Sequence, residues 1–200
     1  MDASEKKMHY IRCYEYLLWI RVAVILISLL SRIPLIGGYV ALVRFLPSLA
    51  MIAVLWKLAD GKDRYRKAMI LLAVSFGIEV VTHLVGSLTN DSQMVTAAAV
   101  INLAASLFSF LAVYQEYNAH AERIEPLDPA LSRKWRGLFN WQIVFWIGSW
   151  LMFGALSVLM LVMPAITEIY AWVVEVVQLI INWCYINNLL AMCRRLKNAE

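Results

Sequence analysis

The sequence predicts an all-α integral membrane protein with six transmembrane helices and both termini in the cytoplasm. Three observations predict it. The 200-residue chain is 62% hydrophobic and only 16% charged, whereas soluble domains are roughly 45 to 50% apolar. The apolar residues gather in six runs that are each long enough to cross a bilayer, and Lys and Arg cluster at alternate breaks between them. We therefore expect one transmembrane helical domain over residues 1–200.

The six predicted spans follow from length and punctuation. A bilayer core of about 30 Å needs roughly 20 mostly apolar helical residues. The breaks contain turn-forming or polar sequences, such as "SRIPLIGG", "DGKDRYRK" and "TNDSQ". At the last break, "VMPA", Pro164 suits the first turn of a new helix. The spans lie near 13–31, 36–58, 68–88, 94–115, 139–162 and 166–190.

The first two spans each carry a cation. Lys6 and Lys7 precede the first run as they would in a secretory signal, but Arg21 interrupts its core and no A-x-A site follows. We therefore expect a retained helix. In the second span Arg44 lies close to Pro47, whose ring frees a backbone carbonyl.

Orientation follows from the bias of Lys and Arg. Basic residues cluster before the first span, around 57–67, in 123–136 and at the C-terminus, whereas the alternate breaks hold only Arg32. Because basic loops stay in the cytoplasm, both termini are expected there, in a protein of the bacterial cytoplasmic membrane. Aromatic residues near the same ends predict an interfacial belt. These are Tyr10, Tyr14, Tyr16, Trp56, Tyr65, Tyr114, Tyr117, Trp135 and Trp141.

The longest break, residues 118–137, is expected to be a cytoplasmic loop. Asp128 and Pro129 form an N-cap and N1 pair. Basic residues then alternate with apolar ones, which indicates an interfacial helix leading into the fifth span. A solvated linker is the alternative reading.

The third and sixth spans carry carboxylates at the predicted membrane midplane. Glu79 lies about 16 Å into a span that starts near residue 68, and Glu175 lies about 15 Å into the last span. Glu79 shares a helix face with His83, and Glu175 shares one with Gln178 and Asn182. An ionisable group at this depth is costly and is therefore expected to face the protein interior.

These residues predict a binding site for a solute or ion. Arg21 and Arg44 supply complementary cations and Asn102 adds an amide on the fourth span, so the predicted site residues are Glu79, His83, Glu175, Gln178, Asn182, Arg21, Arg44 and Asn102. The alternative is that two arginines and two glutamates form buried ion pairs that fix helix register. In either case at least one arginine should contact a carboxylate.

No metal site or cofactor is expected. Glu79 and His83 have the i, i+4 spacing of metal ligands on a helix, but no second histidine lies in any predicted span. His9 and His120 fall outside the spans and are expected to be solvated. Cys13, Cys184 and Cys193 form no CxxC pair and are interpreted as small apolar side chains.

Three function classes remain. The first is a small membrane transporter, or the membrane-embedded substrate-binding component of one, for a small solute, cation or proton. The second is a non-catalytic membrane subunit, regulator or assembly factor with structural ion pairs. The third is a membrane-embedded enzyme, for which no nucleophile and base motif is found.

Expected partners are the lipid bilayer, a small-molecule or ionic substrate, and a second copy or a partner membrane subunit. Nucleic acid is excluded, because no basic face with interleaved aromatics lies outside the apolar runs.

Overall fold

The described elements are all helices, as predicted. The computed structural model describes residues 3–30, 43, 45–59, 63–88 and 92–198. The helices are α1 (Ala3–Leu30), α3 (Leu46–Leu58), α4 (Asp63–Leu88), α5 (Ser92–Ile124), α6 (Pro129–Val162) and α7 (Pro164–Asn198).

Four segments within these helices are long and apolar enough to span a membrane: Glu5–Leu30, Asp63–Gly86, Pro129–Leu156 and Ala165–Asn198. A shorter apolar helix, Leu46–Leu58, is the described part of the predicted second span. At about 1.5 Å per residue, the 34 residues of α6 extend over about 51 Å, well beyond a bilayer core of about 30 Å. The longest helices are therefore longer than a bilayer core is thick.

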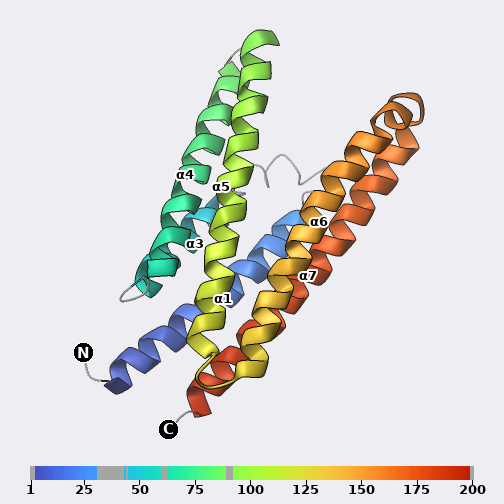
Figure 1. Cartoon of the computed structure of the whole chain (residues 1–200). Coiled ribbons are helices and arrows are strands. Elements are labelled where there is room, and N and C mark those ends of the chain that lie inside the picture. The colour runs from blue at the N-terminus through green and yellow to red at the C-terminus, as the bar shows by residue number, and fades with distance from the viewer. Residues whose placement is uncertain (1–2, 31–42, 44, 60–62, 89–91, 199–200) are drawn as a thin grey trace.

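The helices pack in a closed sequence around the bundle. α4 and α5 form one hairpin and α6 and α7 form another, while α5 also contacts α6. α1 packs against α7 and α3, and α3 packs against α4. Figure 1 shows the two hairpins converging near the chain termini and diverging toward their opposite ends. The packed part of the molecule is thus the end that carries both termini.

The buried side chains gather at this converging end. Tyr14 of α1, Leu58 of α3, Ile124 of α5, Trp135 of α6 and Leu189 of α7 all have 0% exposure. Toward the diverging ends, large apolar side chains are exposed, including Leu151 (68%). Lipid tails are as apolar as these side chains, so a membrane helix gains little by burying them against a neighbour.

Seven of the nine predicted belt residues divide into two groups, which corrects part of the predicted belt. Tyr16, Trp56 and Trp141 are 54 to 70% exposed, as residues at a lipid interface would be. Four others lie inside the bundle instead, at 0 to 3% exposure: Tyr14, Tyr65, Tyr117 and Trp135. Inside, the hydroxyls of Tyr14 and Tyr65 bond each other at 3.0 Å. A hydrogen-bond partner lowers the free-energy cost of burying each of these two hydroxyls.

The predicted start of α6 is confirmed. The backbone N–H of Leu131 donates to Asp128 Oδ1 at 3.0 Å, and Pro129 is the first helical residue. This hydrogen bond and the guanidinium of Arg195, 3.0 Å from Asp128 Oδ2, hold the pKa of Asp128 below its ordinary 3.8. Residues 118–137 thus comprise the last turns of α5, a connection at 125–128 and the first turns of α6. Pro164 likewise begins α7.

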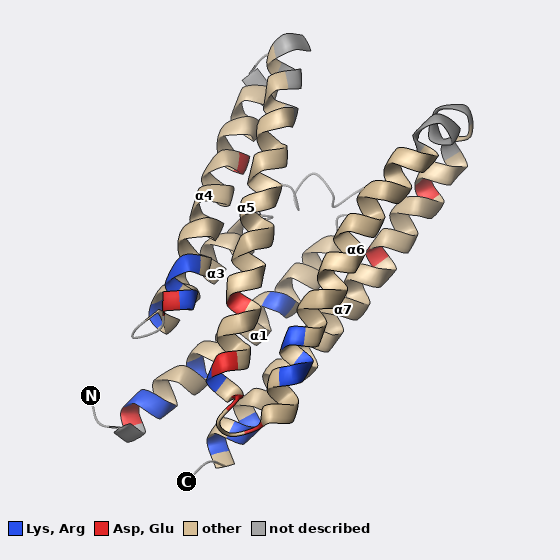
Figure 2. Cartoon of the chain, in the orientation of Figure 1, with Lys and Arg blue, Asp and Glu red and all other residues tan. Residues whose placement is uncertain are grey.

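Charged residues outside the apolar regions meet at the converging end. Arg64 of α4 contacts Glu122 of α5, and Lys197 of α7 bonds Glu15 of α1 at 2.8 Å. Figure 2 shows most of the Lys and Arg residues in this part of the molecule. The start of α4, the α5–α6 connection and both chain ends are therefore close together, as the pattern of basic residues predicted. The side of the membrane on which they lie remains a prediction.

Candidate functional site

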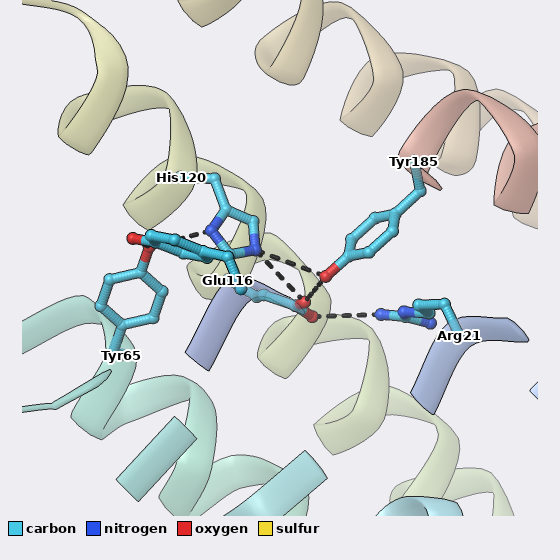
Figure 3. A network of polar contacts seen from close by, with 6 residues as sticks. Arg21, Tyr65, Glu116, His120 and Tyr185 are labelled. Carbon is cyan, nitrogen blue, oxygen red and sulfur yellow. Dashed lines mark hydrogen bonds and ion pairs between the residues drawn. The ribbon is translucent and has the colours of Figure 1, made fainter. Parts of the chain in front are cut away.

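A buried carboxylate on α5 organises the candidate site. Arg21 Nη2 of α1 donates to Glu116 Oε2 at 3.2 Å, and the Tyr185 hydroxyl of α7 donates to Glu116 Oε1 in a short hydrogen bond. The Glu116 side chain is only 3% exposed and that of Arg21 is 18% exposed. Figure 3 shows these groups converging from three different helices. The carboxylate thus joins α1, α5 and α7 inside the bundle.

His120, one helical turn after Glu116, extends the network to α4. Its Nε2 lies 3.4 Å from Glu116 Oε1, and its Nδ1 lies 2.9 Å from the Tyr65 hydroxyl. The Tyr65 hydroxyl in turn lies 3.0 Å from that of Tyr14. A neutral imidazole with its hydrogen on Nε2 donates to Glu116 and accepts from Tyr65, so both ring nitrogens are satisfied. Tyr14, Tyr65, His120 and Glu116 therefore form a continuous hydrogen-bonded chain.

Aromatic rings enclose this chain. The His120 ring centroid lies 4.6 Å from that of Trp135, and Arg21 Cζ lies 4.3 Å from the centroid of the Tyr185 ring. The second contact is a cation–π interaction, which adds to the ion pair in holding the guanidinium. Within the described part of the chain, Arg21 Nε and Trp135 Nε1 are buried and have no hydrogen-bond acceptor.

The ion pair lies in the wall of a cavity of about 220 Å³ between α1, α3, α4 and α5. Four polar side chains line it: Arg21, Ser48, Ser109 and Glu116. The rest of its wall is apolar and includes Met51. At about 30 Å³ per water molecule, the space is enough for a few waters or one small solute. The charged groups of Arg21 and Glu116 thus border a space inside the bundle that side chains do not fill.

Arg21 is the predicted site residue that this network includes. The prediction that at least one of the two arginines contacts a carboxylate is confirmed by Arg21, whose partner is Glu116. Arg44, the second predicted cation, lies outside the described residues.

The polar stripe of the third span joins α4 to α5. Ser75 Oγ donates to the Ala105 carbonyl at 2.8 Å and lies 3.4 Å from Glu79 Oε1. Thr82 Oγ1 donates to Asn102 Oδ1 at 2.7 Å. Glu79 is half-buried, Asn102 and His83 are exposed, and the His83 ring packs on Phe45 at 5.8 Å. The stripe is therefore a helix–helix contact, and a binding role for its residues remains a prediction.

The polar stripe of the sixth span lies on the other hairpin. Glu175 is buried and accepts a hydrogen bond from Ser28 Oγ of α1 at 3.2 Å. Asn182 is also buried, and Gln178 is half-buried. α4 and α7 belong to different hairpins, which diverge away from the chain termini (Figure 1). The structure gives Glu79 and Glu175 different neighbours, Ser75 and Ser28, and does not show the two carboxylates forming one site.

The prediction that His120 is solvated is wrong. Its side chain is fully buried, because Glu116 and Tyr65 supply partners for both ring nitrogens. Glu116 and Tyr185 were not among the predicted site residues either. One signal was available: Glu116 and His120 have the same i, i+4 spacing as Glu79 and His83. Within the described ranges, no three His, Cys, Asp or Glu side chains are grouped so that they could hold a metal ion.

The arrangement offers a fixed charge pair, two hydroxyls and a space beside them, with a hydrogen-bonded chain behind the carboxylate. Such a set can bind a small polar solute. Comparison of the chain with protein-family models, curated proteins and solved structures finds no match.

Proposed function

We propose that the protein is a small membrane transporter, or the membrane-embedded binding component of one, and that its solute binds in the cavity beside Arg21 and Glu116. One observation carries the proposal: a buried ion pair lines a cavity of about 220 Å³ together with Ser48 and Ser109. An ion pair that served packing alone would be expected to be enclosed by side chains, because interiors are close-packed.

The lining indicates the chemistry of the solute. A guanidinium and a carboxylate 3.2 Å apart present one donor-rich and one acceptor-rich group to the same space. A small zwitterion matches both charges, whereas a simple anion or cation matches only one. The apolar remainder of the wall, including Leu72 and Val113, suits a short hydrocarbon portion.

The arrangement of the helices also supports transport. The buried core and the network close the converging end, whereas the hairpins diverge toward their opposite ends (Figure 1). Alternating access requires a central site with one end closed at a time. Rocking of the α4–α5 hairpin against α1 would alter the contacts of Glu116 with Arg21 and Tyr185.

The test uses purified protein in proteoliposomes with three probes: alanine, lactate and ethanolamine, a zwitterion, an anion and a cation. Ser109→Leu places an isobutyl group in the cavity without altering the ion pair. Leu111→Phe, on the opposite face of α5 where residue 111 is 44% exposed, is the matched control. We expect alanine to raise the melting temperature by roughly 5 to 11 °C at a hundredfold excess over its Kd.

The wild type and Leu111→Phe should both take up alanine down its concentration gradient, and Ser109→Leu should not. If no probe stabilises or enters, or if the two variants behave alike, the solute site is wrong. That outcome favours the second candidate, a non-catalytic membrane subunit. Its supporting observation is that Glu116 accepts bonds from Arg21 and Tyr185 and contacts His120, as a purely structural network would require.

A further inference from the structure

A second hollow lies between α1 and α3 on the outer face of the bundle. This groove of about 600 Å³ is lined on α1 by residues including Tyr16, Trp19 and Ile27, and on α3 by residues including Ala53 and Lys57. Tyr16, Trp19 and Lys57 are all exposed. In a membrane, an open groove between two such helices faces lipid.

The groove is polar at one end only. Of the described residues that line it, Lys57 carries the only charge. Lys57 and Tyr16 lie toward the converging end, because α1 enters the bundle from that end and α3 finishes there (Figure 1). Ile27 and Val43 lie at the far end and are apolar. The groove therefore has the polarity of a single-headed amphiphile.

Charge at the polar end favours an anionic headgroup. No ion pair found among the described residues engages Lys57 or Arg12. Arg12 is exposed and lies four residues before Tyr16, on the same face of α1. Two cations that no ion pair of the described residues engages thus flank the end of the groove, and the Tyr16 hydroxyl adds a donor. Trp19 beside them has the ring type enriched at the headgroup level of membranes.

The length of the groove matches one leaflet. At about 1.5 Å per residue, the path along α1 from Tyr16 to Ile27 is about 16 Å. Half of a bilayer core of about 30 Å is about 15 Å. An acyl chain lying along the groove would therefore extend from the headgroup level to the midplane.

We propose that this groove is a binding site for an anionic glycerophospholipid of the leaflet next to the chain termini, with its phosphate at Lys57 and Arg12 and one acyl chain against Trp19 and Ala53. Ile20 and Pro47 line both the groove and the cavity beside Arg21. A bound acyl chain would consequently support the wall of that cavity. The lipid site does not depend on what the cavity binds.

The test is native mass spectrometry of the full chain released from nanodiscs that contain equal amounts of phosphatidylglycerol and phosphatidylcholine. We expect retained phosphatidylglycerol to exceed phosphatidylcholine, and Lys57→Gln to lower that preference about fivefold, the effect of one basic residue near an anionic surface. Lys134→Gln, an exposed lysine on α6, is the matched control and should leave the preference unchanged.

A bulky side chain placed in the groove tests whether an acyl chain binds there. Ala53→Phe should remove the retained lipid, whereas Val144→Phe, at a 61% exposed position on α6, should not. The proposal is overturned if Lys57→Gln and Lys134→Gln have equal effects, or if Ala53→Phe retains as much lipid as the wild type. If the wild type is a dimer and Ala53→Phe is a monomer, a second copy of the chain, and not a lipid, occupies the groove.

Discussion

Replacing Glu116 with Gln removes the charge at the centre of the network while keeping the size of the side chain. Arg21, only 18% exposed, then loses the carboxylate that lies 3.2 Å from its guanidinium. Removing one partner of a buried ion pair costs about 3 to 5 kcal/mol. For a chain of this length the melting temperature falls by about 2 to 4 °C per kcal/mol, so we expect a loss of about 6 to 20 °C.

Thermal unfolding of the purified protein in a mild detergent, followed by tryptophan fluorescence, measures this loss. Glu79→Gln is the matched control, because Glu79 is half-buried and bonded by Ser75. It should change stability by less than about 1 kcal/mol. The double variant Arg21→Met with Glu116→Gln should recover much of the loss, since no uncompensated charge remains. If Glu116→Gln unfolds within about 1 kcal/mol of the wild type, or if the double variant is no more stable than Glu116→Gln, the Glu116 carboxylate does not compensate the buried charge of Arg21.

Three further predictions concern other parts of the structure. Tyr185→Phe removes the hydroxyl that bonds Glu116 and should destabilise the protein by about 2 kcal/mol in the same thermal assay, whereas equal melting temperatures would contradict that bond. The folded state holds the pKa of Asp128 below 3.8, so its cap should stabilise α6 above about pH 4 and lose that effect as pH falls through the lowered pKa. A melting curve of Asp128→Ala with the same acid dependence as the wild type would contradict this. Asp63→Cys, in a chain whose native cysteines are replaced by Ala, should react with an impermeant thiol reagent only from the cytoplasmic side, and reaction only from the other side would reverse the predicted topology.

Some features of the fold could be predicted because they depend on local chemistry. The N-cap at Asp128 needs only a carboxylate before Pro129, and the start of α7 needs only a proline after a break. The helical apolar runs follow from the length and composition of the chain. The carboxylate contact of Arg21 also follows, because an unpaired cation at that depth is expensive.

The identity of that carboxylate could not be predicted in the same way. Glu116 lies just beyond the expected end of the fourth span, in the polar sequence "YQEYNAHAER", which has the composition of a solvated segment. Its burial depends on α5 continuing to Ile124 and on α1, α4 and α7 converging there. Tyr14 and Tyr65 were assigned to the interface for a related reason. A tyrosine in an aromatic belt and one in a buried network have similar local sequences, and only distant partners distinguish them.

We propose that Arg21 and Glu116 border a hydrated cavity that a solute can enter. Ser109→Cys tests it directly in membranes, in the cysteine-replaced chain, with a small charged methanethiosulfonate reagent. Position 109 lines the cavity, whereas Leu111→Cys lies at nearly the same depth on the exposed, opposite face of α5. Cys at position 109 should react readily, since the reagent needs a thiolate in water, and Cys at position 111 should not. Equal resistance of both positions would contradict it and show that the charge pair lies in a dry bundle.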